Sequence, residues 1–186
     1  MAAERRYDPE RRQRIIEACV DVIAENGVDG TSHRKVAQRA GVPLGSTTYH
    51  FTGREELLRE ALTLFADTVA ERFEARLAAL PVGGGEDEVV EALVALILED
   101  VFPTPRELVL THELYTLAAR SPAFRELTMA WMARSRAALE RHVDPLTARL
   151  LDALIEGLTI HHALGPGMLD AADIAEAVRR TVSRER

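Results

Sequence analysis

The chain has 186 residues, 47% of them hydrophobic and 28% charged, a composition that fits a globular protein and excludes a disordered or fibrous one. A single cysteine excludes an intramolecular disulfide, and the longest apolar run, residues 92–98, is far shorter than the roughly 20 residues of a membrane-spanning helix. The formal net charge of −7 argues against a general polyanion-binding protein, because such binding requires a positive face.

Residues 1–60 contain ten basic and ten acidic side chains, so the whole acidic excess lies beyond them. This balance leaves room for a local anion-binding surface in the first third of the chain. The first ten residues are charged where a secretory signal needs an apolar core. We therefore expect a cytoplasmic protein that makes no contact with a membrane.

Helix start signals recur along the chain. Four times an N-cap residue precedes proline, the residue favoured at the first helical position: Asp8-Pro9, Thr104-Pro105, Ser121-Pro122 and Asp144-Pro145. Two further N-cap candidates have no proline, namely Thr31 and Asp170. Three glycines stand where left-handed C-caps would end a helix: Gly27, Gly41 and Gly165.

These signals and the spacing of apolar residues predict an all-α fold of nine helices without a strand. The predicted helices span residues 9–26, 31–40, 44–51, 54–80, 87–101, 105–120, 122–142, 145–164 and 171–183. The fourth is the longest, roughly 40 Å at about 1.5 Å per residue. The fifth is apolar on nearly every face, which is typical of an enclosed helix.

The most specific pattern of the chain lies between residues 27 and 58. Two short helices are separated there only by residues 41–43, a connection of the length that helix-turn-helix units use. The segment resembles the DNA-binding head of the TetR-family repressors in the order and spacing of Gly27, Thr31, Val36-Ala37, Ala40-Gly41-Val42, Gly45, Tyr49, Phe51 and Arg54-Glu55-Glu56-Leu57.

This resemblance implies a nine-helix TetR-like architecture. A helix-turn-helix DNA-binding domain would occupy residues 1–53, and a domain for effector binding and dimerisation would occupy residues 54–186. The function implied is that of a transcriptional regulator, specifically a ligand-responsive repressor that binds a palindromic operator in double-stranded DNA as a homodimer. Its effector would be a small molecule of unknown identity.

The helix over residues 44–51 is rich in Thr and Tyr and poor in large apolar residues, as expected of a helix presented to the major groove. By position, the base-edge candidates are Leu44, Gly45, Ser46 and Thr48, whereas Thr47 is expected to face elsewhere. The phosphate-contact candidates are Thr31, His33, Arg34, Tyr49, His50 and Arg54. For the two histidines the alternative is an ordinary surface position.

Two departures from the family pattern concern base recognition. The family commonly has Ser-Lys where this chain has Pro43-Leu44, and a second aromatic residue where it has Thr48. A base-reading lysine is therefore missing, and we expect recognition here to depend more on apolar contact and DNA shape.

Catalytic and metal-binding motifs are not found in the sequence. The pair His112-Glu113 lacks the second histidine of a metalloprotease helix, and His161 and His162 diverge by about 100° on a helix. Cys19 lies on the apolar stripe of the first helix and is interpreted as a core residue rather than a redox sensor. We therefore expect no enzyme, no metal and no cofactor.

The second half of the chain contains polar and aromatic residues on helices that are otherwise rich in Leu and Ala. The candidates for a ligand cavity are His112, Tyr115, Trp131 and Arg134. Ordinary core and rim positions are the alternative for these residues. If the cavity exists, the long helix over residues 54–80 would connect its occupancy to the DNA-binding head, with Phe65 and Phe73 as the side chains that respond.

The last two predicted helices carry apolar stripes suited to a four-helix bundle around a two-fold axis. The predicted dimer contacts are Leu151, Leu154, Ile155, Gly157, Leu158, His162, Ile174 and Val178. A rival interpretation is a helical ligand-binding or protein-interaction module without specific DNA binding, which the net charge of −7 and the missing base-reading lysine leave open.

Overall fold

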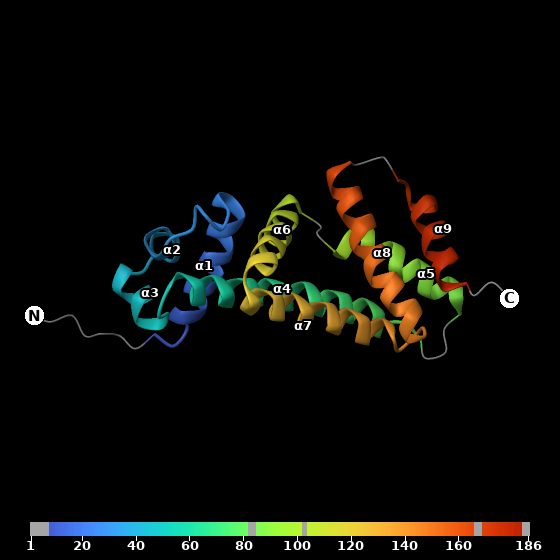
Figure 1. The fold of residues 1–186 in the computed structure, drawn as a ribbon, viewed down its shortest axis with the longest axis horizontal. Helices are drawn as coiled ribbons and strands as arrows, with labels where there is room; N and C mark the ends of the chain where they lie inside the picture. The colour runs from blue at the N-terminus through green and yellow to red at the C-terminus, as the bar shows by residue number, and fades with distance from the viewer. Residues whose placement is uncertain (1–7, 82–84, 102–103, 166–168, 184–186) are drawn as a thin grey trace, which may run out of the picture. The chain divides into compact units, whose positions relative to one another are not determined.

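The structure of the chain is a computed structural model that describes residues 8–81, 85–101, 104–165 and 169–183. Within these residues it contains nine α-helices, one π-helical turn and no strand, which confirms the predicted all-α fold (Figure 1). The elements are α1 (Arg11–Asn26), α2 (His33–Ala40), α3 (Leu44–His50), α4 (Arg54–Ala78), α5 (Glu86–Ala95), η1 (Leu96–Asp100), α6 (Pro105–Arg120), α7 (Pro122–Leu139), α8 (Pro145–Leu164) and α9 (Ala171–Val182). None of these helices is long and apolar enough to cross a bilayer.

The chain divides into two compact units, residues 1–65 and residues 66–186. The division falls inside α4, so about three turns of this helix belong to the first unit. The predicted domain boundary lies after residue 53, directly before α4 begins at Arg54.

Three of the four starts marked by proline are confirmed, since α6, α7 and α8 begin at Pro105, Pro122 and Pro145. The fourth is wrong, because α1 begins at Arg11 and not at Pro9. The carboxylate of Asp8 does not cap the helix but forms an ion pair with Arg14 at 2.6 Å. A surface ion pair therefore occupies the carboxylate that was predicted to cap the helix.

Two further cap predictions are wrong. The N-cap of α2 is Ser32, whose Oγ accepts from the N–H of Lys35, whereas Thr31 is buried and its hydroxyl donates to the carbonyl of Gly27 at 2.8 Å. Gly165 ends α8 with φ of −134°, outside the left-handed region. Gly41, in contrast, ends α2 in the predicted left-handed conformation, with φ of 64°.

In the first unit, α1 contacts both α2 and α3. Ile15, Cys19 and Ile23 on α1 are fully buried, as the predicted apolar stripe requires. The long side chain of Arg12 covers this core at its edge, because its guanidinium lies 5.3 Å from the ring centroid of Phe51 and pairs with Glu60 at 2.8 Å. The α2–α3 segment thus packs against α1 and the buried core of the first unit.

In the second unit, α6 packs on α7, α7 on α8, and α9 contacts both α5 and α8. The predicted fifth helix is interrupted, because α5 passes into the π-helical turn η1 before Val101. Two acidic residues of this turn are held by one arginine of α4: Arg76 pairs with Asp100 at 2.5 Å and with Glu99 at 3.1 Å.

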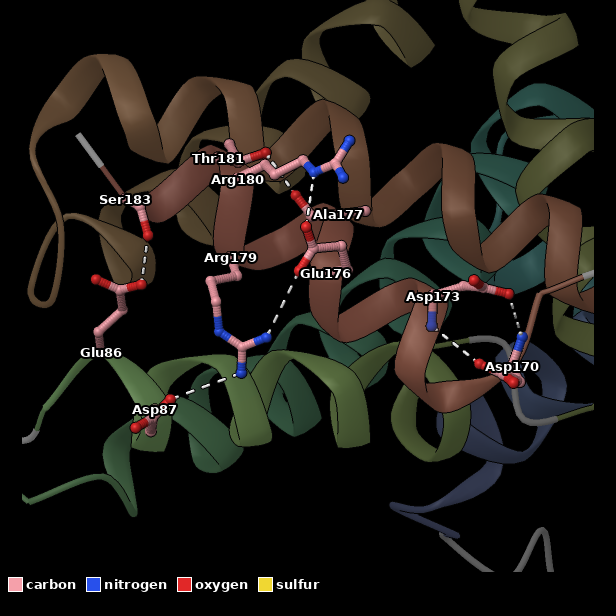
Figure 2. A network of polar contacts seen from close by, with 10 residues as sticks. All are labelled: Glu86, Asp87, Asp170, Asp173, Glu176, Ala177, Arg179, Arg180, Thr181 and Ser183. Atoms are coloured by element: carbon pink, nitrogen blue, oxygen red, sulfur yellow. Dashed lines mark hydrogen bonds and ion pairs between the residues drawn. The ribbon is translucent and has the colours of Figure 1, made fainter. Parts of the chain in front are cut away.

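The last helix docks on α5 with an apolar face and a polar edge. Ile174 and Val178 of α9 are fully buried in the unit. Figure 2 shows the polar edge, where Arg179 reaches Asp87 at 3.6 Å and the hydroxyl of Ser183 donates to Glu86. The same view shows the N-cap of α9, where Asp170 and Asp173 bond each other's backbone N–H groups. The last turn of α9 is therefore tied to α5, while its first turn is closed by its own cap.

Candidate functional site

The turn between α2 and α3 has the geometry of a helix-turn-helix. At the end of α2 the N–H of Gly41 bonds the carbonyl of Gln38 at 3.3 Å, and the N–H of Val42 bonds that of Ala37 at 3.0 Å. Only Gly41, Val42 and Pro43 separate the two helices. Since a positive φ strains any residue with a Cβ, glycine at position 41 allows this tight connection.

One face of α3 anchors the helix and the other is presented to solvent. Thr47 is fully buried and its hydroxyl donates to the carbonyl of Leu44 at 2.8 Å, so it faces away from solvent as predicted. Leu44 and Tyr49 are 45% and 84% exposed, unusual values for residues of this size. The predicted base-edge residues Gly45 and Thr48 are exposed as well, and Ser46 is half-buried.

Gly45 is not required by the packing of the chain. A Cβ at this position would meet no atom within 4 Å, and the residue lies in the first turn of α3. The absence of a side chain leaves the backbone of α3 accessible on its exposed face. Such a position suits close approach of another molecule to the helix.

Two of the predicted phosphate-contact residues are engaged in the fold. Arg54, the first residue of α4, donates from Nε to the carbonyl of Thr31 at 2.9 Å and from a second guanidinium nitrogen to the carbonyl of Val28. Thr31 is itself buried. These contacts tie the start of α4 to the segment that precedes α2.

The other phosphate-contact candidates lie at the ends of α2 and α3. Arg34 and Tyr49 are exposed, and the ring of Tyr49 stands edge-on against His50 with centroids 5.0 Å apart. His33 is the first residue of α2 and is half-buried, with an Nδ1 that has no partner among the described residues. The structure therefore groups these side chains on adjoining helices.

The charges of the first unit are distributed unevenly over its helices. Five arginines form ion pairs inside the unit: Arg12 and Arg59 pair with Glu60, Arg11 and Arg14 with Asp8, and Arg39 with Asp21 and Glu25. Arg34 and Lys35 form no ion pair with any described residue, and Lys35 donates only to the neutral side chain of Asn26, at 3.0 Å. The first turns of α2 are therefore positive although residues 1–60 are neutral overall. Lys35 was not among the predicted phosphate-contact residues. It is the one lysine of the sequence, which is the signal that could have pointed to it.

A second candidate site is a small cavity of about 40 Å³ in the second unit. It brings together two of the four predicted ligand residues, because the rings of Tyr115 and Trp131 lie 6.3 Å apart at an angle of 37°. Its walls come from α4, α6, α7, α8 and the residue after η1, and the remaining lining residues are Val69, Phe73, Val101, Met132, Ser135, Asp152, Ile155 and Glu156.

Two carboxylates that were not predicted give this cavity its polarity. Asp152 pairs with Arg136 at 3.2 Å, while burial raises the pKa of its carboxyl against the effect of that arginine. Burial also raises the pKa of Tyr115 above its usual range, and the charge and hydrogen bond of Glu156 add to the effect. The Tyr115 hydroxyl thus remains a proton donor. Asp152 and Glu156 are the only acidic residues of α8 and lie four residues apart, a spacing that places them on one helix face.

The other two predicted ligand residues do not line the cavity. His112 is exposed and its Nδ1 contacts the carbonyl of Leu108 at 2.8 Å. Arg134 pairs with Asp67 and Glu74, each at 2.8 Å, and lines a separate groove between α4 and α7. Arg134 lies three positions after Trp131 on α7, but its ion pairs with Asp67 and Glu74 of α4 hold its guanidinium outside the cavity.

The predicted dimer residues fall into two classes. Leu151, Ile155, Ile174 and Val178 are at most 3% exposed within the single chain, so the structure assigns them to its own core. The half-buried residues Leu154, Gly157 and Leu158 keep exposed surface on α8, which also presents Leu146 and Leu150, exposed by 62% and 52%.

His162 is half-buried as well, but it also lines a cavity. This cavity of about 190 Å³ is also lined by Thr104, Thr159 and the apolar residues Ile97, Leu98, Val101, Pro105 and Ala163. Neither the Nδ1 of His162 nor the hydroxyl of Thr159 has a hydrogen-bond partner among the described residues. The structure thus places His162 beside an internal space in the second unit.

Each of the two units contains a segment that matches a known protein family. Residues 15–61 match the family described as bacterial regulatory proteins, tetR family, and residues 84–184 match the tetracyclin repressor-like C-terminal domain. The HTH-type transcriptional regulator PksA of Bacillus subtilis is 27% identical over 188 residues, which cover 92% of this chain and 88% of PksA.

Solved structures share the fold over nearly the whole chain. A candidate transcriptional regulator of Streptomyces coelicolor A3(2), SCO7518, is 54% identical with a TM-score of 0.87, covering 95% of this chain and 100% of its own. The multidrug binding protein EbrR is 34% identical with a TM-score of 0.78 and coverages of 96% and 98% in its complex with imidazole. EbrR has also been solved with ethidium, proflavin and malachite green.

Proposed function

Because the chain belongs to the TetR family of bacterial regulatory proteins and is a DNA-binding transcriptional regulator, we propose that it is a ligand-responsive repressor. In this proposal it binds a palindromic operator as a homodimer in the cytoplasm and releases it when a small molecule occupies the second unit. Residues 1–53 supply DNA binding and residues 54–186 supply ligand binding and dimerisation. Repression is its activity, and no catalytic step is involved.

The exposed face of α3 is the observation that carries the DNA-binding part. Base edges are read by Leu44, Gly45, Ser46 and Thr48, because these residues share the solvent side of a helix that Thr47 anchors from behind. The methyl groups of Leu44 and Thr48 suit thymine, which compensates for the missing lysine. Recognition therefore combines apolar contact with DNA shape.

Phosphate contacts come from the surrounding residues and fix the position of α3 on the duplex. Arg34, Lys35, Tyr49, His33 and His50 act directly from α2 and α3. Thr31 and Arg54 act with them at the start of α2 and α4, Arg54 mainly by holding the backbone that leads into α2. Positive charge on the first turns of α2 supports this arrangement in a chain with an acidic total.

The effector binds beside Tyr115 and Trp131. The complexes of EbrR with ethidium, proflavin and malachite green support an aromatic ligand for this chain. A cavity of about 40 Å³ holds only a few water molecules, so an aromatic ligand requires movement of its walls. Val69 and Phe73 of α4 form part of these walls, so ligand binding favours a conformation in which α4 has a different position. This is the helix that begins at Arg54.

A second copy of the chain covers the outer face of α8. Leu154, Leu158 and the exposed Leu146 and Leu150 supply apolar surface, and Gly157 has open space where a Cβ would stand. A two-fold axis beside α8 would place this face against the same face of the second copy, and residues near the axis would meet their own copies.

Salt dependence of DNA binding tests the proposal against a helical module without specific DNA binding. The logarithm of the binding constant should fall steeply with the logarithm of salt concentration, by about 0.9 for each phosphate contact. Anisotropy titrations with DNA that flanks the gene and with a scrambled duplex supply the measurement. A flat salt dependence, or equal affinity for both duplexes, would favour the module.

A further inference from the structure

We infer that the cavity beside Thr159 and His162 is a second ligand site, which takes a small uncharged molecule with an apolar body and one hydroxyl group, such as a phenol. Among the residues that the structure describes, Val101 is the one that lines both this cavity and the proposed effector cavity. The inference goes beyond the proposed function and does not depend on operator binding, because it concerns a site within the second unit alone.

The size of the cavity fits such a ligand. Its volume is about 190 Å³. An engineered apolar cavity of about 150 Å³ binds benzene, so this space holds a six-membered ring with one substituent. The cavity beside Tyr115 and Trp131, at about 40 Å³, cannot hold the same molecule unless its walls move. A molecule of this size is therefore expected to enter the larger space.

The walls of the cavity favour an uncharged ligand. Five of the eight lining residues that the structure gives are apolar, and none is an aspartate, glutamate, lysine or arginine. A charged ligand would lose its hydration here and find no carboxylate, ammonium or guanidinium group as a partner. The apolar body of a ligand, in contrast, gains from leaving water.

Two polar atoms of α8 have no partner in this mainly apolar space. Thr159 is 1% exposed, and its hydroxyl makes no hydrogen bond with any described residue. The buried Nδ1 of His162 has no partner among them either, and three positions on a helix place the two residues on one face. The third polar wall residue, Thr104, is engaged as the N-cap of α6, where its hydroxyl accepts from the N–H of Glu107 at 3.4 Å.

The unpaired hydroxyl of Thr159 is the observation that carries the inference. A buried hydroxyl without a partner destabilises a fold, whereas valine has the same shape and no polar group. Thr111, which is equally buried, avoids this cost because its hydroxyl donates to the carbonyl of Glu107, four residues earlier, at 3.0 Å. The Thr159 hydroxyl makes no such bond and stays available. A phenol hydroxyl both donates and accepts, so it can serve Thr159 and His162 together.

Phenol and toluene, which have nearly the same size, test the inference by isothermal titration calorimetry on the full chain. Phenol should bind at least about tenfold more tightly than toluene, because it supplies the missing hydrogen bonds. Benzoate and benzylammonium, which have a ring of the same size and carry a charge, should bind more weakly than phenol. No binding of phenol, equal affinities for phenol and toluene, or tighter binding of either ion would each overturn the inference.

Substitution Thr159→Val keeps the shape of the wall and removes its hydroxyl. It should weaken phenol binding by about three- to tenfold, leave toluene binding unchanged, and raise the urea midpoint of the chain without ligand. The matched control Thr111→Val removes a hydroxyl that has a partner, so it should lower the urea midpoint and leave phenol binding unchanged. Circular dichroism establishes that both variants retain the fold.

Two results with Thr159→Val would contradict the inference. Unchanged phenol affinity would show that the hydroxyl does not contact the ligand. A lower urea midpoint would show that the hydroxyl is already paired within the chain. The comparison of phenol with toluene uses the natural chain, so it decides the matter even if a variant fails to fold.

Discussion

The guanidinium of Arg54 donates a hydrogen bond to the main-chain carbonyl of Thr31 at 2.9 Å, which joins the first residue of α4 to the residue before the N-cap of α2. A second bond from the same guanidinium reaches Val28. The start of α4 is therefore fastened to the segment that leads into α2, whose first turn is positively charged. A residue placed by sequence among the DNA contacts thus also orients the DNA-binding unit.

Substitution Arg54→Ala should lower both stability and DNA affinity. Two part-buried carbonyls lose charged donors, and we expect a loss of roughly 1–3 kcal/mol in the free energy of unfolding. Affinity should fall alike for all DNA sequences, because α2 loses its support while the base-reading residues remain. Urea denaturation and anisotropy titrations supply the two measurements. Arg34→Ala is the control, since it should weaken DNA binding at unchanged stability.

Substitution Gly45→Ala should separate stability from DNA binding. Alanine favours a helix by about 1 kcal/mol over glycine, and the added methyl group meets no atom of the chain. The variant should therefore unfold at a higher urea concentration and yet bind its operator more weakly, because the methyl group occupies space needed by the DNA. Unchanged operator affinity would show that α3 does not approach the DNA at this residue.

Thr48→Ala and Tyr49→Phe should affect DNA binding in different ways. Thr48 is exposed and its hydroxyl makes only a long bond of 3.3 Å to the carbonyl of Gly45, so it is available to a base. Its removal should change the preference at about one base pair per half-site, by roughly 1–3 kcal/mol. Loss of the Tyr49 hydroxyl should weaken all sequences equally. Affinities for a set of operator variants will distinguish the two patterns, and no change in either variant would contradict the assignment of α3.

Local sequence signals predicted helix ends correctly where a single residue type suits a specific backbone conformation. Pro105, Pro122 and Pro145 mark helix starts because proline suits the first helical position, and Gly41 marks an end because it accepts a positive φ. Thr31 and Ser32 are both good N-caps, and the choice between them depends on Gly27, whose carbonyl takes the Thr31 hydroxyl. That contact is not encoded in helix propensity.

The cavity was only half predictable for a similar reason. Tyr115 and Trp131 stand out on helices rich in Leu and Ala, and both line the space. Arg134 stands out equally, but its ion pairs with Asp67 and Glu74 of α4 hold its guanidinium in a separate groove. The positions of Asp152 and Glu156 facing the rings depend on how α8 is rotated against α7, which follows from packing between helices distant in sequence.

Cys19 should be inert in the folded protein. Burial raises the pKa of its thiol from 9.0 to about 12, so almost no thiolate is present at pH 8. A thiol-specific reagent should label the protein in urea but not in buffer. Because the folded pKa exceeds the unfolded one, this thiol should also reduce stability as the pH rises above about 9. Rapid labelling of the native protein would show that Cys19 is accessible and reopen the redox interpretation.

Charge substitutions on α8 should separate the proposed dimer interface from the core of the chain. Leu154 retains exposed surface, whereas Leu151, three residues earlier, is fully buried in the single chain. Leu154→Glu should leave the chain folded but monomeric, because the two-fold axis would place identical charges against each other in a desolvated contact. Leu151→Glu should instead unfold the second unit, since a buried carboxylate there finds no partner. Met129→Glu, on the exposed side of α7, should remain a folded dimer and serves as the control for added charge. Sedimentation and circular dichroism give mass and helix content for all three, and a dimer from folded Leu154→Glu would exclude this face of α8 as the interface.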